Sequence, residues 1–264
     1  MKQKIHYLNQ YFFDNRHHIV IKLIGCGGNG SAMLANLARI NLFLTNNGHK
    51  GLHVITYDDD TVTNANRERQ SFSIADQGIE KAVIATSRIN SYYGTSWEYE
   101  PVKLSFVNIN TVLHGSEIII TCVDKVSPRK IIFNWIEALE SYRKTHEEGF
   151  SRAPFYWMDL GNDFRFGQMI FGTMGKLSQT RSKKYRTVTM MKNVIEEYPD
   201  IKDPIDTEYG CSANHNMQTQ DLFINSHLAL LSADYLFSLL KHKYTHHRGI
   251  LTNLDTGLNK KLSL

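Results

Sequence analysis

A short apolar run followed at once by a glycine-rich turn constrains this chain more than any other feature. Residues 19–24 read Ile-Val-Ile-Lys-Leu-Ile, and residues 25–31 read Gly-Cys-Gly-Gly-Asn-Gly-Ser. A mostly apolar, β-branched run suits a strand of a parallel sheet that is covered on both faces. Glycines placed directly after such a strand let the backbone approach a phosphate, and the start of a helix adds partial positive charge there. The pattern therefore predicts a nucleotide-binding turn between a buried strand and a helix.

The spacing of the glycines adds some specificity. Gly25, Gly27 and Gly30 fit the pattern G-x-G-x-x-G, and Gly28 is a fourth glycine in the same turn. This motif indicates a nucleotide more firmly than it indicates which nucleotide or which reaction.

Strand and helix patterns alternate after this turn. The expected strands are 19–24, 51–57, 97–102 and 117–122, and the expected helices are 31–44, 78–92 and 128–142. Such alternation predicts an α/β fold with a Rossmann-like, doubly wound and mostly parallel sheet. Beyond residue 150 we expect two additional C-terminal strands (155–159 and 168–172), a polar crossover segment (176–210) and a long final helix (221–241). We predict one domain over residues 1–264, with residues 19–140 as its nucleotide-binding core and residues 150–264 as its C-terminal part.

The bulk properties exclude several classes of protein. The net charge of +4 is too weak to indicate nucleic-acid binding, and no apolar run is long enough to cross a membrane. Cys26, Cys122 and Cys211 lie far apart, so the sequence has neither a zinc ribbon nor a disulfide framework. We expect a cytoplasmic protein that binds neither nucleic acid nor membrane.

Carboxylates follow the second expected strand. Asp58 comes directly after residues 51–57, where a carboxylate in a dinucleotide fold accepts hydrogen bonds from ribose hydroxyls. The alternative is that Asp58, Asp59 and Asp60 form a solvated turn that caps the next segment.

Cations follow this acidic turn. Arg67, Arg69 and Lys81 each suit a solvated surface when taken alone, but as a set they favour nucleotidyl transfer over hydride transfer. The reason is that fixed cations stabilise the charge that develops on phosphoryl oxygens in the transition state.

A further carboxylate, Asp124, follows the strand expected at 117–122. At the carboxyl end of a buried strand, and with a triphosphate nearby, its natural role is to hold Mg²⁺. Asp124 also precedes the helix that begins near Ser127 and Pro128, so it could cap that helix. The two interpretations are compatible.

Taken together, these residues resemble the ThiF/MoeB/HesA adenylyltransferases, which share the fold of ubiquitin-activating enzymes. The matching pieces, in order, are residues 25–31, 58–62 and 66–70, Gly78 with Lys81, residues 122–124 with Arg129, and the later strand at 166–170. Through residues 57–62 and 220–225 the chain is most similar to the ThiF family protein of the bacterial PRTRC gene system.

The resemblance implies that ATP and Mg²⁺ bind at the carboxyl edge of the sheet. It also implies activation of the C-terminal carboxylate of a ubiquitin-like or sulfur-carrier-like protein, usually a terminal glycine, as an acyl adenylate. The nucleotide site that it implies consists of Gly25, Gly27, Gly28, Gly30, Ser31, Asp58, Asp60, Asn66, Arg69, Gln70 and Lys81. Arg69, Lys81 and Asp124 would be catalytic, with Asp124 positioning Mg²⁺. We also expect a homodimer and, since the paired C-x-x-C motifs of many relatives are absent, no structural zinc.

Some relatives pass the acyl group to a cysteine of their own. Cys211 is the candidate here, because it lies in a polar segment before the last long helix, with His215 as a nearby base. The alternative is an ordinary loop cysteine. Cys26 and Cys122 are expected to be packing residues.

Two other functions stay open at this point. One is a non-catalytic nucleotide-binding adaptor of a bacterial mobile-element gene system. The other is an NAD(P)-dependent oxidoreductase on the same fold.

Overall fold

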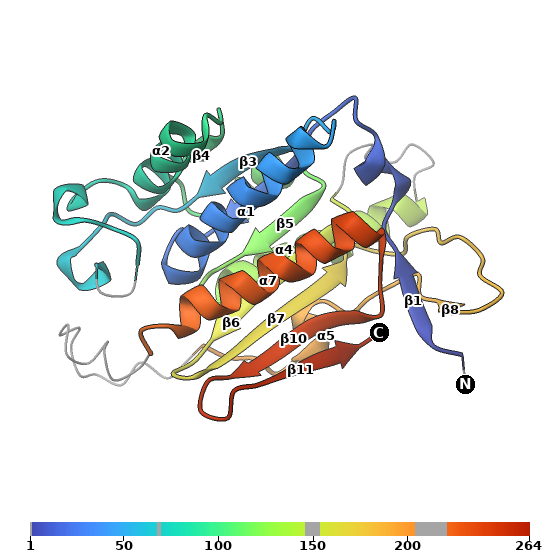
Figure 1. Ribbon diagram of the computed structural model, residues 1–264. Coiled ribbons are helices and arrows are strands. Elements are labelled where there is room, and N and C mark those ends of the chain that lie inside the picture. The colour runs from blue at the N-terminus through green and yellow to red at the C-terminus, as the bar shows by residue number, and fades with distance from the viewer. Residues whose placement is uncertain (1, 68–69, 146–153, 204–220) are drawn as a thin grey trace.

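An eight-stranded sheet runs through the centre of the computed structural model, which describes residues 2–67, 70–145, 154–203 and 221–264 (Figure 1). In their order across the sheet, the strands are β11 (Leu258–Ser263), β10 (His247–Asn253), β7 (Phe166–Thr173), β6 (Tyr156–Asn162), β5 (Ile118–Thr121), β2 (Ile19–Ile24), β3 (Leu52–Tyr57) and β4 (Glu98–Glu100). The strands from β6 to β4 are parallel, whereas β7, β10 and β11 are added antiparallel. The predicted Rossmann-like, mostly parallel sheet is therefore confirmed.

Helices cover both faces of this sheet. Their bounds are α1 (Gly28–Asn46), α2 (Lys81–Tyr93), α3 (Ile109–Leu113), α4 (Val126–Thr145), α5 (Val194–Glu197) and α7 (Ile224–His242), with short 3-10 turns at Gln10–Phe13, Asn64–Asn66 and Ile74–Asp76. Helices α1, α2 and α7 bury their apolar sides on one face of the sheet, and α3, α4 and α5 bury theirs on the other. In β5, Ile118 and Ile120 belong to the first core and Ile119 to the second, which explains why three successive residues of that strand are isoleucine.

The C-terminal part holds more strands than its sequence pattern indicated. Residues 245–264, which show no clear alternation, form β10 and the edge strand β11. Four of the six residues of β11 are exposed in succession, so no buried face marks it as a strand. A separate small sheet, in the order β8-β1-β9, joins β8 (Arg186–Thr187), β1 (Lys4–Tyr7) and β9 (Tyr244–Thr245). Within the described ranges, no helix is long and apolar enough to cross a membrane.

His247, at the start of β10, makes the stability of the fold depend on pH. Its ring lies half-buried at 5.1 Å from the ring of Tyr235, and burial lowers its pKa to about 4, with Lys261 adding to the effect. An unfolded histidine titrates near 6.5. The folded state therefore resists protonation, and its stability falls as the pH drops from about 6.5 toward about 4.

We expect His247→Gln to reduce the loss of melting temperature between pH 7.5 and pH 5, as measured by circular dichroism. The exposed His114 provides the control, since His114→Gln should leave that loss as in the parent protein. Equal losses in the parent and in His247→Gln would show that another group is responsible.

Candidate functional site

The order of the strands reverses between β2 and β5. From β2 the chain moves outward through α1 to β3 and through α2 to β4, and it then crosses back to β5 and, through α4, to β6. In open α/β sheets the crevice at such a reversal, at the carboxyl ends of the strands, is where ligands bind. The glycine-rich turn follows β2, Asp58 follows β3 and Asp124 follows β5, so all three lie along this edge.

The glycine-rich turn is packed too closely for side chains at two of its positions. Gly25 has a φ of +93°, and a Cβ there would lie 2.6 Å from the carbonyl oxygen of Cys122. A Cβ on Gly30 would lie 1.8 Å from the carbonyl oxygen of Gly25. The turn of β2 and the loop after β5 are thus in direct contact, and only glycine allows it.

Helix α1 begins inside this turn. Gly27 is its N-cap residue, and the first intrahelical bond runs from the N–H of Ser31 to the carbonyl oxygen of Gly27 at 2.9 Å. The N–H groups of the residues between them have no partner within the helix and are available to an anion. The Ser31 hydroxyl turns back to the carbonyl oxygen of Gly28 at 3.5 Å, so its side chain is used within the helix.

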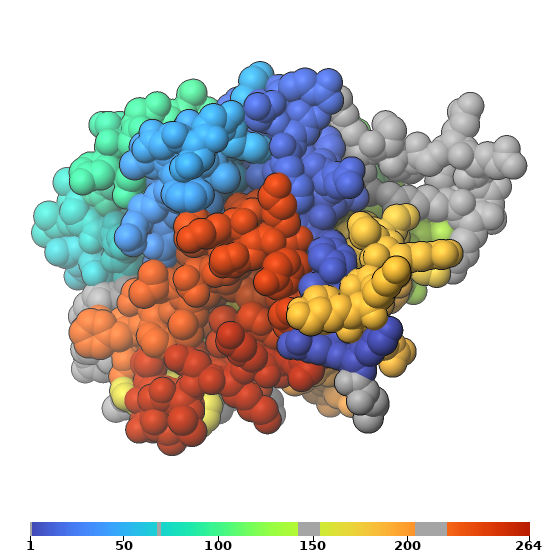
Figure 2. Space-filling model, turned by 45° about the vertical axis from the view of Figure 1, so that its right-hand side comes forward, coloured from blue at the N-terminus to red at the C-terminus, as the bar shows by residue number. Residues whose placement is uncertain are grey.

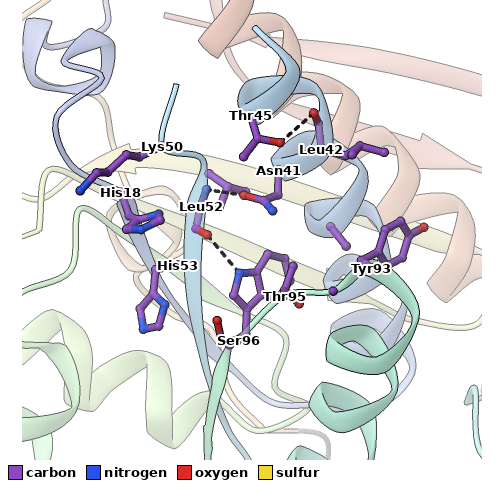
Figure 3. Close-up of a pocket in the computed structure, with 13 residues that line it drawn as sticks. His18, Asn41, Leu42, Thr45, Lys50, Leu52, His53, Tyr93, Thr95 and Ser96 are labelled. Atoms are coloured by element: carbon purple, nitrogen blue, oxygen red, sulfur yellow. Dashed lines mark hydrogen bonds between the residues drawn. The ribbon is translucent and has the colours of Figure 1, made fainter. Parts of the chain in front are cut away.

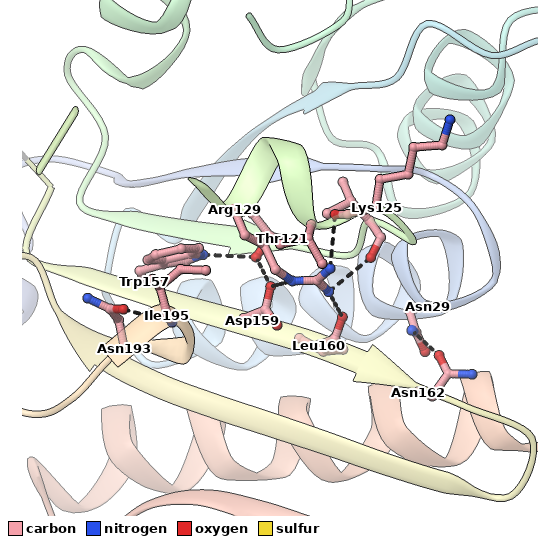
Figure 4. Close-up of polar contacts among 12 residues, drawn as sticks. Asn29, Thr121, Lys125, Arg129, Trp157, Asp159, Leu160, Asn162, Asn193 and Ile195 are labelled. Carbon is pink, nitrogen blue, oxygen red and sulfur yellow. Dashed lines mark hydrogen bonds and ion pairs between the residues drawn. The ribbon is translucent and has the colours of Figure 1, made fainter. Parts of the chain in front are cut away.

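Two asparagines from distant parts of the chain, Asn162 and Asn225, border the turn, and a third, Asn29, belongs to it. A Cβ on Gly28 would lie 2.6 Å from Nδ2 of Asn225, at the start of α7. The Asn29 side chain donates through Nδ2 to Oδ1 of Asn162, at the end of β6, at 2.7 Å (Figure 4). Oδ1 of Asn29 is buried and has no partner among the described residues. Asn162 and Asn225 are far from the turn in the sequence, so no local pattern marks them, although the resemblance over residues 220–225 includes Asn225.

Asp58 connects the acidic turn to the glycine turn. Its carboxylate accepts hydrogen bonds from the N–H of Cys26 at 2.5 Å and from the N–H of Asp60 at 2.9 Å. Burial raises the pKa of Asp58, and the two N–H donors partly oppose that rise. Asp59 and Asp60 are exposed. The half-buried Asp58 therefore fixes the acidic turn to the glycine turn. Asp59 and Asp60 are solvated, as expected for an exposed turn.

Lys81, the first residue of α2, brings a cation to this edge. Its ammonium lies 2.8 Å from a carboxylate oxygen of Asp60, and its side chain is 8% exposed. Its backbone N–H also bonds the carbonyl oxygen of Asp60 at 2.9 Å. Asp60 thus holds Lys81 at the first residue of α2.

The segment after the acidic turn supplies amide side chains. Asn66 accepts the N–H of Thr63 at 2.9 Å, which closes a capping box around the turn Asn64–Asn66. A Cβ on Gly27 would lie 3.7 Å from Nε2 of Gln70, so the Gln70 amide borders the glycine cradle. Oε1 of Gln70 is buried and has no partner within the described part of the chain. Arg69 and Cys211 fall outside the described residues.

Asp124 is exposed, and Arg129 fixes the loop that carries it. The buried Arg129 guanidinium donates to the carbonyl oxygens of Val123 at 2.9 Å, Lys125 at 3.0 Å and Leu160 at 3.2 Å (Figure 4). These bonds hold the residues on either side of Asp124. A carboxylate oxygen of Asp203 accepts the N–H of Val126, the first residue of α4. Asp203 therefore caps this helix at the position for which Asp124 was a candidate.

A buried ion pair anchors Arg129. Its Nε lies 2.7 Å from Oδ1 of Asp159, which is 1% exposed, and the same oxygen accepts the Thr121 hydroxyl at 2.5 Å. The indole N–H of Trp157 donates to that hydroxyl at 2.8 Å. This network ties the carboxyl ends of β5 and β6 together beneath the loop of Asp124.

The two described cysteines lie in the core. Cys26 is buried and Cys122 is half-buried, and burial raises the pKa of both thiols well above the usual range. Neither is suited to act as a thiolate nucleophile at neutral pH.

A cavity of about 270 Å³ lies elsewhere, at the amino-terminal edge of the parallel strands (Figure 3). It is lined by the end of α1, the start of β3 and the residues after α2, among them Asn41, Leu52 and Thr95. Because the glycine turn lies at the opposite edge, this cavity is separate from the candidate nucleotide site.

The residues at the carboxyl edge fit a nucleotide with its metal ion. The N–H groups at the start of α1 suit phosphate oxygens, and Asn29 and Gln70 offer buried oxygens that have no partner in the described part of the chain. Lys81 offers a positive charge, and Asp124 offers exposed oxygens of the kind that Mg²⁺ prefers.

A family model described as ThiF family matches residues 13–146, about half of the chain and the half that carries this edge. The chain belongs to the ThiF family. A search of curated proteins finds no significant match.

The fold of this chain is similar to that of several solved structures. A crystal structure of PaaA is 15% identical to this chain with a TM-score of 0.63, and the match covers 96% of this chain and 66% of PaaA. Escherichia coli MccB in complex with MccA-N7isoAsn is 16% identical with a TM-score of 0.61, and the match covers 96% and 65%. The same MccB with ATP is 15% identical with a TM-score of 0.60 and the same coverage. This chain thus spans just under two thirds of the length of these proteins.

Proposed function

We propose that this chain is an ATP-dependent adenylyltransferase that activates the C-terminal carboxylate of a polypeptide. The observation that carries the proposal is that the glycine-rich turn, Lys81 paired with Asp60, and the exposed Asp124 all lie at the carboxyl edge of the parallel strands, where the strand order reverses. Membership of the ThiF family supports it. Its structural neighbour MccB is described as a microcin C7 biosynthetic enzyme and has been crystallised with ATP and with MccA.

For this reaction the protein needs mainly to position ATP and the substrate carboxylate and to stabilise the negative charge on the phosphates. An oxygen of the substrate carboxylate attacks the α-phosphorus of ATP, the bond from that phosphorus to the bridging oxygen breaks, and pyrophosphate leaves. The N–H groups at the start of α1 would hold phosphate oxygens, and Lys81 would stabilise the charge that builds on them. Asp124 would hold Mg²⁺, which neutralises phosphate charge when bound. Arg69 would add a second cation.

The finer identity of the substrate is part of the same proposal. The substrate would be a ubiquitin-like or sulfur-carrier-like protein with a C-terminal glycine. The likeness to the ThiF protein of the PRTRC gene system suggests that the gene of such a partner belongs to the same gene system. A homodimer and an onward transfer to Cys211 belong to this proposal as well.

The test is exchange of labelled pyrophosphate into ATP in the presence of a small protein that ends in Gly-Gly. We expect Asp124→Ala to lower the exchange rate roughly hundredfold, because charge stabilisation in the transition state is lost. Glu137→Ala, which removes an exposed carboxylate from α4, is the matched control and should keep the parent rate.

Full exchange by Asp124→Ala would show that this carboxylate does not serve the metal. Thermal stabilisation by ATP and Mg²⁺ without any exchange would favour the adaptor function, and stabilisation by NAD instead of ATP would favour the oxidoreductase.

A further inference from the structure

A cleft of about 650 Å³ is lined by Lys2, by Lys4 in β1 and by residues 181–187, which carry β8, and its lining is basic. Figure 2 shows the N-terminal segment, in blue, against this yellow-orange segment. We call it the basic cleft; its charged lining consists of Lys2, Lys4, Arg181 and Arg186, with Tyr185 beside them. All four cations are exposed, and no Asp or Glu contributes to the lining.

The pairing of β1 with β8 brings like charges together. The strands are parallel, and Lys4 lies opposite Arg186 in the register. Like charges in this position destabilise a sheet. The Lys2 ammonium donates to the carbonyl oxygen of Lys183 at 2.7 Å, and that of Lys4 donates to the backbone oxygen of Leu264 at 2.5 Å. Among the described residues, no ion pair joins a cation of the cleft to an Asp or Glu side chain.

The sequence around β8 adds to this positive field. Residues 174–193 contain six Lys or Arg residues and neither Asp nor Glu. A concave surface of one charge sign raises the local concentration of ligands of the opposite sign. The like charges cost folding stability, and among the described residues backbone oxygens, not Asp or Glu side chains, accept from Lys2 and Lys4, which is typical of a surface kept for a partner.

The cleft suits an extended polypeptide better than a nucleic acid. β8 is an edge strand of its small sheet, and an edge strand can pair with an added strand of a partner. Tyr185 is the only aromatic residue in the lining, whereas single-stranded nucleic acids bind on rows of aromatic rings. We infer that the basic cleft binds an acidic, extended segment of a partner protein.

This surface is distinct from the nucleotide site. β1 also pairs with β9, which follows the end of α7, whereas Asn225 at the start of α7 contacts Gly28. The 19 residues of α7 separate the two ends by about 28 Å. Figure 1 shows β1 and β8 at the end of the molecule away from the start of α1. The inference therefore does not rest on adenylyl transfer.

The test measures binding of a fluorescein-labelled octaglutamate peptide to the full chain by fluorescence anisotropy, without ATP. We expect Lys4→Glu/Arg186→Glu to weaken binding at least about tenfold. The control is Lys103→Glu/Lys130→Glu, which changes the net charge equally at two exposed positions away from the cleft and should weaken binding less than about twofold. Circular dichroism melting establishes that both variants are folded.

A second measurement uses the single variant Arg186→Glu, which places a carboxylate opposite Lys4 and removes no hydrogen bond of the Lys4 ammonium. It should raise the melting temperature while it weakens octaglutamate binding, a combination that loss of folding does not produce. Equal weakening by the two double variants would overturn the inference, since overall charge alone would then explain binding. Tighter binding of an octathymidylate that depends on Lys4 and Arg186 would overturn it in favour of nucleic acid. Pyrophosphate exchange tests the proposed function separately.

Discussion

Replacing Arg129 with methionine is expected to lower the free energy of unfolding by about 3–5 kcal/mol, because the carboxylate of Asp159 is left buried without its counter-ion. The hydrogen bonds to the carbonyl oxygens of Val123, Lys125 and Leu160 are lost at the same time. For a domain of this size each kcal/mol lowers the melting temperature by about 2–4 °C. Urea unfolding followed by circular dichroism measures the free energy directly.

The matched control is Arg16→Met. Arg16 also pairs with a carboxylate, that of Asp14, but its side chain is 83% exposed. Exposed ion pairs contribute about 0–1 kcal/mol, so this variant should unfold nearly as the parent does. The double variant Arg129→Met/Asp159→Leu should recover part of the loss, since no unpaired charge remains buried. If Arg129→Met were as stable as Arg16→Met, the pair beneath the Asp124 loop would have to be open to water.

Gly30→Ala is expected to disrupt the glycine turn and the binding of ATP with it. The added methyl would lie 1.8 Å from the carbonyl oxygen of Gly25, so the backbone of the turn must move. Overpacking of this kind costs about 1–3 kcal/mol, and the displaced N–H groups no longer converge on a phosphate. Differential scanning fluorimetry with and without ATP and Mg²⁺ reports both effects, because a ligand that binds the folded state raises its melting temperature.

Gly27→Ala separates the two effects. A Cβ at Gly27 meets only Nε2 of Gln70 at 3.7 Å, which is ordinary contact, so the unliganded protein should melt as the parent does. A smaller ATP-dependent shift in this variant would indicate that a phosphate approaches Gly27. If Gly30→Ala kept the full ATP-dependent shift, the nucleotide would have to bind elsewhere.

Local sequence patterns were sufficient to predict the parallel half of the sheet. Residues 19–24 and 117–122 are apolar except for Lys22, Glu117 and Thr121, because helices cover both faces of β2 and β5, and such burial can be recognised from a few neighbouring residues. Glycine is required at positions 25 and 30 by backbone geometry, which the G-x-G-x-x-G spacing also reports. The carboxyl-edge location of Asp58 and Asp124 follows from strand direction alone.

The other features depend on contacts between segments that are distant in the chain. Asp203 occupies the helix cap for which Asp124 was a candidate, and it lies 77 positions beyond Val126. β11 shows no alternation because both of its faces are largely exposed, and β1 acquires its partners only where β8 and β9 meet it.

The sequence by itself therefore determined the order of the elements, the glycine turn and the edge at which the polar residues gather, since each depends on residues close together in the chain. The tertiary structure alone decided that Arg129 and Asp159 support the Asp124 loop, that Asn162 and Asn225 border the glycines, and that Lys4 lies opposite Arg186. Each of these pairs brings together residues separated by 30 or more positions, and no local periodicity records such a contact.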